Sequence, residues 1–174
     1  GDLASSTLLP ATKPGDKAWI QYRFSQPVTI KSLTIVGGGF GGTFGFGADP
    51  DNRTLESSDD GKTFSKVIDI RRGGVDQKTL TFSPVTAKYF RFTWLTPQPA
   101  PAFDFGAMLG LGSGQTPQAP SGTQIAELNL HTVARINRFE DKAAFAAATD
   151  LYTALTPEVS ADEAIKKSDV IDLT

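Results

Sequence analysis

Several features are missing from this sequence, and each absence narrows the classes of protein that it can encode. There is no cysteine, which excludes disulfides and thiolate metal sites, and a single histidine, His131, leaves little for a transition-metal centre. Seventeen Lys and Arg against nineteen Asp and Glu give a formal charge of −2 with no basic block. Nucleic acid and membrane are therefore not expected as partners. No apolar run approaches the ~20 residues that cross a bilayer.

The residues that are present fit one globular domain of ordinary composition. The chain has 174 residues, of which 39% are hydrophobic and 21% charged. This length allows one well-buried core and is short for two. Composition by itself does not identify a function.

The first 135 residues consist of alternating and apolar runs separated by turn signals, which predict strands. Gln26-Pro27 is interpreted as a break between the first two strands, and Asp60-Gly61 as a hairpin turn of two to four residues. The strands are expected over Trp19–Phe24, Val28–Val36, Arg53–Ser58, Thr63–Ile70, Thr79–Phe82, Lys88–Leu95 and Thr123–Val133. Without intervening helices, this spacing predicts an all-β, jelly-roll-like antiparallel β-sandwich.

Alternation within these strands predicts which side chains face the core. We expect the following residues to point inward: Ile20, Tyr22, Phe24, Phe90, Phe92, Trp94, Ala126, Leu128 and Leu130. Glu127, Asn129 and His131 should point outward, and His131 is expected to be an ordinary sheet histidine. Trp19 and Trp94 are both expected in or near the core.

The C-terminal residues follow another pattern and predict a short helical linker. Asn137 can cap a helix, and Ser160 with Glu163 forms a capping box for a second one. Asp169–Leu173 then resembles a strand whose partner lies elsewhere. We therefore divide the chain into a sandwich, residues 1–135, and a linker that leads to a following domain, residues 136–174.

Two stretches, Gly37–Asn52 and Pro97–Gly122, are expected to be long loops, which in compact domains usually carry function or are disordered. Gly37–Gly42 formally matches the dinucleotide-binding pattern G-x-G-x-x-G. The residues after it stay glycine-rich instead of opening a helix, so we expect a loop and no nucleotide site.

Four motifs in order resemble a galactose-binding, discoidin-type domain. They are the strand pair Trp19–Ile30, the hairpin Ser57–Phe64, the strand Ala87–Phe92 and the closing strand Ile125–Leu130. Ala134–Phe145 and Asp169–Thr174 further resemble the segments that follow this sandwich in glycoside hydrolase family 106, which contains α-L-rhamnosidases. The resemblance covers roughly residues 15–174. The first strand and its loop are short or missing here.

The resemblance implies a non-catalytic accessory domain of a large bacterial glycoside hydrolase, which is secreted or periplasmic. Its catalytic acids would lie in a barrel outside this chain, so none is expected here. The domain would pack against its neighbours in the parent enzyme and could bind plant or bacterial polysaccharide. The alternative is a free-standing carbohydrate-binding or adhesion-type discoidin domain.

Loops at one end of the sandwich are the expected carbohydrate site under this resemblance, because aromatic rings stack on sugars and polar side chains bind hydroxyls. The candidates are Phe46, Asp49, Arg72, Gln77, Phe103 and Asp104. Alternatively, the loop phenylalanines only pin these loops to the domain.

Glu127 is the candidate metal ligand, since relatives use a glutamate in this strand to hold a structural calcium. Calcium takes six to eight oxygens, and Asp49, Asp51 and Asn52 offer more of them in the glycine-rich loop. The alternative is a plain surface glutamate. No other cofactor is expected.

Overall fold

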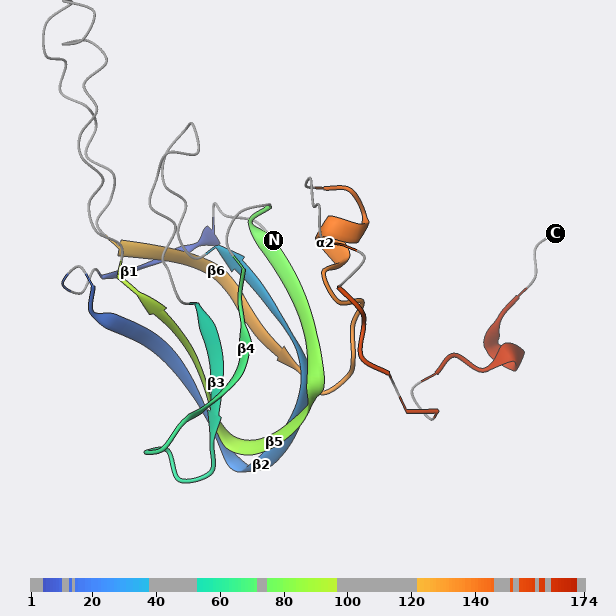
Figure 1. The fold of residues 1–174 in the computed structure, drawn as a ribbon, viewed down its shortest axis with the longest axis horizontal. Coiled ribbons are helices and arrows are strands. Elements are labelled where there is room, and N and C mark those ends of the chain that lie inside the picture. The colour runs from blue at the N-terminus through green and yellow to red at the C-terminus, as the bar shows by residue number, and fades with distance from the viewer. Residues whose placement is uncertain are drawn as a thin grey trace, which may run out of the picture.

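The computed structural model describes residues 5–10, 13, 15–37, 53–71, 75–96, 122–145, 151, 154–158, 160–161 and 164–171, and the structural statements below concern these residues. Six antiparallel strands form one sheet in the order β1-β6-β2-β5-β3-β4 (Figure 1). Their bounds are β1 Thr7–Pro10, β2 Lys17–Gly37, β3 Thr54–Ser58, β4 Ser65–Asp69, β5 Gln77–Leu95 and β6 Gly122–His131. The prediction of an all-β antiparallel fold is confirmed.

β2 and β5 are long, bent strands where the sequence predicted two short strands each. Pro27 lies in a register shift between Arg23 and Val28, and Pro84 lies in a shift opposite Lys31. Since a proline has no N–H to give to a ladder, it is tolerated where the ladder is already interrupted. The predicted break at Gln26-Pro27 is therefore wrong, because the irregularity bends the strand without ending it.

The bends fold the single sheet over on itself and create two layers (Figure 1). In one layer, the first half of β2 pairs with the second half of β5, which also pairs with β3. In the other layer, the second half of β2 lies between the first half of β5 and β6 and pairs with both. Phe90 and Phe92 lie between the layers with at most 1% of their surface exposed. Phe92 stacks on Trp94, with ring centroids 5.2 Å apart. The predicted core face of β5 is confirmed.

The partners of these aromatic residues come from β2 and β6. Ile20 and Phe24 pack against the core from β2, and Tyr22 donates its hydroxyl to the backbone carbonyl of Leu128. Leu128 and Leu130 also face the core, but Ile125 is buried in place of Ala126. The reason is a bulge: Val36 pairs with Glu127 and Gly37 with Ile125, so that Ala126 has no partner and the alternation shifts.

Trp19 is not a core residue, contrary to the sequence-based expectation. It follows the opposite phase from Ile20 along β2, so its side chain lies on the outer face, and 55% of its surface is exposed. Trp94, in contrast, is buried.

The β3–β4 hairpin has a longer connection than the predicted turn of two to four residues, because residues 59–64 separate the paired strands. Gly61 has a φ of +71°, which is the left-handed conformation that the Asp-Gly pair predicted. The Asp60 side chain fixes the loop by accepting hydrogen bonds from the backbone N–H groups of Lys62 and Thr63, at 2.8 and 2.9 Å.

The C-terminal segment begins by closing the free edge of β5. Arg138 donates its backbone N–H to the carbonyl of Thr79 at 2.8 Å, and the Asn137 side chain accepts from the N–H of Thr81 at 3.1 Å. Glu140, which is 4% exposed, accepts the backbone N–H of Thr79 at 2.9 Å. These contacts satisfy backbone groups that a neighbouring strand would otherwise take.

The helix that follows is shorter than expected and begins differently. α2 spans Phe139–Lys142, and its N-cap is Arg138 in the left-handed conformation, not Asn137. The Asn137 side chain is engaged with Thr81 and with the carbonyl of Leu155 instead.

Ala154 is buried, and Leu155 and Thr156 accept hydrogen bonds from Asn137, whereas residues 164–171 lie away from the sheet (Figure 1). Asp169 ends a 3-10 helix, η3 (Lys167–Asp169), and Val170 and Ile171 are exposed and not in a strand, so the predicted strand is not formed by the described residues. Glu163, half of the predicted capping box, lies outside the described residues. No helix in the described part of the chain is long and apolar enough to cross a membrane.

Candidate functional site

A groove of about 630 Å³ lies where the outer face of β6, β2 and β5 meets the C-terminal segment. Its floor is polar because alternate residues of each strand point to this face. Its wall consists of residues from the chain that follows β6. The floor is formed by Thr34, Gln77, Thr79, Glu127, Asn129 and His131, and the wall by Ala134, Arg135, Ile136 and Phe139.

Strand register explains why the floor residues meet. Thr34 pairs with Asn129 on one side and with Thr79 on the other, which puts these three side chains in one row across the sheet. Val36 pairs with Glu127 and with Gln77, so those two form the ends of the next row. Two residues that the sequence analysis proposed for different roles, Gln77 for sugar and Glu127 for metal, thus line one groove.

His131 closes one end of the floor as a neutral side chain. Its Nε2 lies 3.0 Å from the Thr34 hydroxyl. Partial burial, and then the positive charge of Arg135, hold the pKa of the imidazole below its ordinary value of 6.5. At neutral pH the ring can therefore accept at one nitrogen and donate at the other.

Glu127 makes few contacts with the described residues. The Asn129 amide lies 3.4 Å from its carboxylate, which is a long hydrogen bond. The described residues contain no group of three His, Cys, Asp or Glu that could hold a metal ion. One carboxylate and one amide are fewer than the six to eight oxygens of calcium, so the described surroundings of Glu127 do not fit that ion.

The wall is held in place by hydrogen bonds to the sheet. Ser32 donates its hydroxyl to the carbonyl of Val133 at 2.7 Å, and Thr81 donates to that of Arg135 at 2.5 Å. Glu140 lies behind the wall and accepts from the Gln77 amide at 2.9 Å and the Thr79 hydroxyl at 2.7 Å. The same carboxylate therefore anchors α2 and orients two floor residues of the groove.

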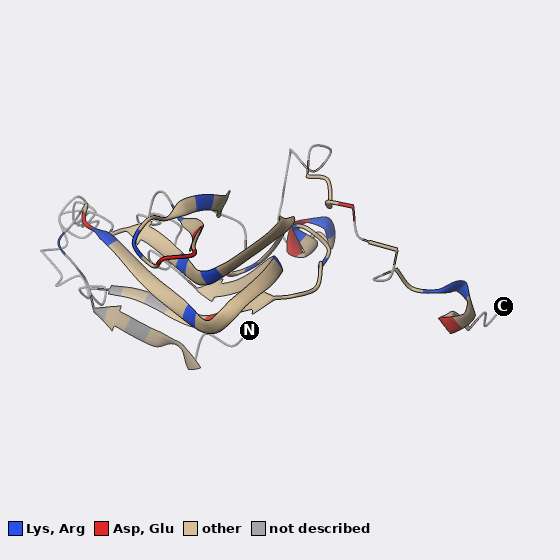
Figure 2. Ribbon diagram, turned by 90° about the horizontal axis from the view of Figure 1, so that it is seen from below, with Lys and Arg blue, Asp and Glu red and all other residues tan. Residues whose placement is uncertain are grey.

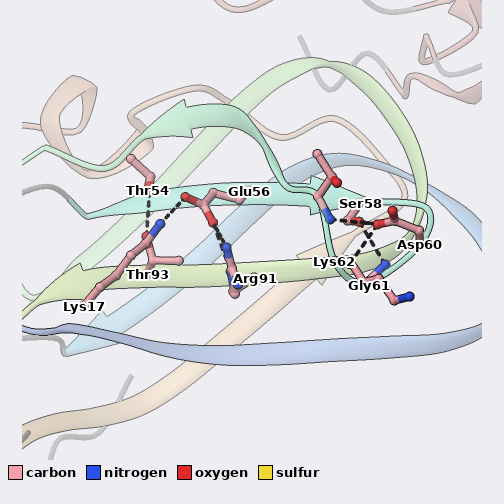
Figure 3. A network of polar contacts seen from close by, with 10 residues as sticks. Lys17, Thr54, Glu56, Ser58, Asp60, Gly61, Lys62, Arg91 and Thr93 are labelled. Atoms are coloured by element: carbon pink, nitrogen blue, oxygen red, sulfur yellow. Dashed lines mark hydrogen bonds and ion pairs between the residues drawn. The ribbon is translucent and has the colours of Figure 1, made fainter.

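A second polar cluster occupies the outer face of the other layer, and its contacts are structural (Figure 3). Glu56 receives Lys17 Nζ at 2.6 Å and Arg91 Nη2 at 2.7 Å. Partial burial raises the pKa of Glu56, but the hydrogen bonds and charges of Lys17 and Arg91 outweigh it, and the net pKa lies below the ordinary value. Arg91 also lies 3.7 Å above the ring of Phe64. A carboxylate held between two cations is poorly placed to act as a general acid.

The remaining predicted sugar ligands, Phe46, Asp49, Arg72, Phe103 and Asp104, lie outside the described residues, as do the candidate calcium ligands Asp51 and Asn52. Sequence reasoning placed Asn129 and His131 outward correctly but assigned them no site. It missed the wall because Ile136 and Phe139 were attributed to a linker. One feature of the sequence could have indicated the wall. The outward-facing polar residues of β6 are followed directly by a segment that contains the apolar residues Ile136 and Phe139.

Figure 2 shows Lys and Arg positions interspersed with Asp and Glu positions along the described strands and α2. This distribution agrees with the small net charge and suits a neutral ligand better than a polyanion.

Comparison with solved structures finds a rhamnosidase and several carbohydrate-binding modules that are similar to this chain. Among solved structures, a rhamnosidase from Novosphingobium sp. PP1Y is 23% identical, with a TM-score of 0.59, and the match covers 90% of this chain and 12% of that one. A chitosan-binding module of a Paenibacillus sp. IK-5 chitosanase/glucanase, in complex with chitotriose, is 16% identical with a TM-score of 0.44, covering 75% and 80%. A pectin-binding carbohydrate-binding module is 17% identical with a TM-score of 0.44, covering 77% and 76%.

No curated protein matches the chain. The model of the α-L-rhamnosidase family, glycoside hydrolase family 106, matches residues 6–174. The chain spans about an eighth of the Novosphingobium rhamnosidase and shares its fold over that part. It therefore belongs to glycoside hydrolase family 106.

Proposed function

We propose that this chain is a non-catalytic accessory β-sandwich of a larger bacterial glycoside hydrolase, in which it packs against the catalytic domain. The family match over nearly the whole chain, together with the small share of the rhamnosidase that the chain covers, supports this proposal. The parent enzyme would be secreted or periplasmic and would act on plant or bacterial polysaccharide.

The observation that carries the proposal is the position of the exposed apolar side chains. Nine large hydrophobic residues are exposed among those described, and eight of them lie between residues 133 and 171. They are Val133, Ile136, Phe139, Phe145, Leu155, Ile165, Val170 and Ile171. Exposed apolar side chains that are concentrated in one part of a chain are typical of an interaction site, and the end of this part lies away from its own domain. A neighbouring domain is the partner that would bury it.

The carboxylates of the described residues support a non-catalytic role. Glycosidases use a pair of carboxylic acids on either side of the scissile bond. The described lining of the groove contains one, Glu127. Glu56 and Glu140 are each engaged in structural hydrogen bonds. We expect purified chain to release no product from an aryl α-L-rhamnoside, and turnover that disappears when one of its acids is mutated would refute the non-catalytic role.

Docking can be tested with the chain and the separately produced remainder of the parent enzyme. Ile165→Asp and Ile171→Asp place charges on the extended segment and should abolish association in a titration calorimeter. Trp19→Asp is the matched control, since it also charges an exposed large hydrophobic position, but on the opposite layer of the sandwich. Equal affinity of all three variants and the wild type would contradict docking through this segment.

A further inference from the structure

We propose that the groove is the part of the interface that recognises the neighbouring domain by charge, and that it receives an extended segment of that domain carrying one basic and one acidic side chain. This inference rests on the proposed function and deepens it by giving the partner's point of entry and its chemistry. Apolar and charged groups line the same groove, since Ile136 and Phe139 lie in it together with Glu127 and Arg135.

Docking of a neighbouring domain takes the charges of the groove out of water. Ile136 and Phe139 are 56% and 41% exposed and belong to the apolar surface that the neighbour would bury. A domain that covers them also covers Glu127 and Arg135, because all four side chains line one space. A charge removed from water without a partner is strongly destabilising, so the covering domain has to supply a partner for each of the two.

Neither charge has such a partner in the described part of the chain. The Glu127 carboxylate accepts one long hydrogen bond, from the Asn129 amide at 3.4 Å. Arg135 is exposed, and its bonds to the Thr81 hydroxyl are made by its backbone. The ion pairs among the described residues include neither Glu127 nor Arg135. Both charges are therefore available to a partner.

Strand register keeps these two charges apart. Glu127 lies in the row of Val36, and Arg135 is bonded to Thr81, which lies in the row of Ser32. Val36 and Ser32 are four positions apart along β2, which separates the rows by roughly 13 Å. An extended segment spans that distance in about four residues, and side chains four positions apart on it point to the same side. One such segment can therefore meet both charges.

The floor between the charges is neutral and bonds to uncharged groups. Asn129 and His131 supply an amide and an imidazole, which donate to and accept from backbone groups of the segment. Opposite charges at the two ends also permit one direction only. A reversed segment would bring its basic side chain to Arg135 and its acidic one to Glu127, and both contacts would be repulsive. The groove thereby fixes the orientation of the neighbour, whereas apolar contacts alone are not directional.

The groove is formed before the partner arrives. Hydroxyls of Ser32 and Thr81 hold the carbonyls of Val133 and Arg135, and the backbone N–H of Arg138 bonds to β5. Little conformational entropy of the wall is then lost on docking.

Salt distinguishes recognition by charge from purely apolar docking. Titration calorimetry of the chain with the remainder of the parent enzyme measures the affinity at about 50 and about 500 mM NaCl. Because added ions screen charges at an interface, we expect wild-type association to weaken about tenfold over this range. Arg135→Gln and Glu127→Gln should each weaken association about tenfold at the lower salt concentration, and the double variant should lose the salt dependence.

The connection between β3 and β4 provides matched controls. Lys62→Gln and Asp59→Asn change the net charge of the chain by the same amounts as the groove variants, but they replace exposed residues that do not line the groove. Both should associate like the wild type. They separate contacts within the groove from the effect of net charge on association.

The intact parent enzyme gives a second measurement. His131 lies on the floor of the groove and is the single histidine of this chain, so its modification reports on the groove alone. Diethyl pyrocarbonate acylates a neutral imidazole, and mass spectrometry of the peptide that contains His131 follows the rate. We expect labelling to be about tenfold slower in the intact enzyme than in the isolated chain, because a covered groove excludes water and reagent.

Failure of the inference is distinguishable from failure of the proposed function. If Ile165→Asp abolished association but both groove variants bound like their controls, the groove would lie outside the interface. Equal labelling of His131 in the chain and in the intact enzyme would also overturn the inference, since the groove would be open. In both cases docking would stand. If the wild-type chain did not associate with the remainder of the enzyme, docking itself would be refuted, and the inference with it.

Discussion

Replacing Glu140 by alanine should detach the C-terminal segment from the sandwich. The carboxylate is buried and accepts three hydrogen bonds, from the Gln77 amide and from both the N–H and the hydroxyl of Thr79. Thr79 is itself buried, so both of its donors lose their acceptor in the variant. A buried donor without a partner costs about 1–3 kcal/mol.

Two unsatisfied donors would lower the free energy of unfolding by about 2–6 kcal/mol. The smaller alanine side chain admits water from the groove, and this water can accept hydrogen bonds from the two donors and reduce the cost. We therefore expect the free energy of unfolding to decrease by about 2–4 kcal/mol. For a domain of this size that lowers the melting temperature by roughly 5–15 °C. Urea denaturation followed by the fluorescence of buried Trp94 measures the first quantity, and calorimetry the second.

Two further variants make the result specific. Glu140→Gln keeps the volume and one acceptor oxygen but turns an amide NH₂ toward other donors, so its cost should be intermediate. Lys142→Ala removes an exposed side chain from the same helix and should change the free energy of unfolding by less than about 0.5 kcal/mol. If Glu140→Ala behaved like Lys142→Ala, the three hydrogen bonds would not be what holds the segment.

Three other perturbations test the sandwich itself. Gly61→Val should lower the free energy of unfolding by at least about 1–2 kcal/mol in urea titrations, because φ is +71° and a Cβ there would meet the Tyr89 ring at 3.0 Å; an unchanged midpoint would contradict the turn geometry. Phe92→Ala should cost about 3–5 kcal/mol by the same assay through lost burial and a cavity, and a cost below 1 kcal/mol would contradict its central position. Asp60 has its pKa lowered from 3.8 to about 2 by the N–H groups of Lys62 and Thr63 and the Ser58 hydroxyl. Because the folded value is the lower one, its contribution is complete above about pH 4 and is lost as the pH falls through 2. Asp60→Asn should flatten that part of the acid-unfolding curve, and identical curves would refute the assignment.

The strands could be predicted from sequence because their signals are local. Alternation placed Phe90, Phe92 and Trp94 in the core, and the Asp60-Gly61 pair identified the hairpin. The bends could not be predicted, since a proline signals an interruption without saying whether the chain leaves the sheet or only changes register. Trp19 was misplaced for another reason. It was assigned to the core because tryptophan is usually buried, although alternation along β2 puts it on the opposite face from the inward-facing Ile20.

The groove was beyond sequence reasoning because it depends on contacts between residues far apart in the chain. Glu140 meets Thr79 across 61 positions, and nothing local distinguishes it from an ordinary residue in the first turn of a helix. Gln77 and Glu127 were proposed separately for sugar and metal, and only the pairing of both with Val36 brings them to one surface. The calcium expectation for Glu127 came from the family resemblance, and it stays a prediction that depends on residues outside the described ranges.

The contacts between the C-terminal segment and β5 have a consequence for how this domain can be excised or transplanted. A chain ended at residue 135 would keep all six strands but would lose Asn137, Arg138 and Glu140, leaving polar backbone groups of Thr79 and Thr81 unpaired. An open strand edge of this kind is a template for another chain, so such a product would be prone to self-association or strand exchange. The smallest portable version of the sandwich therefore extends through α2, to about residue 145.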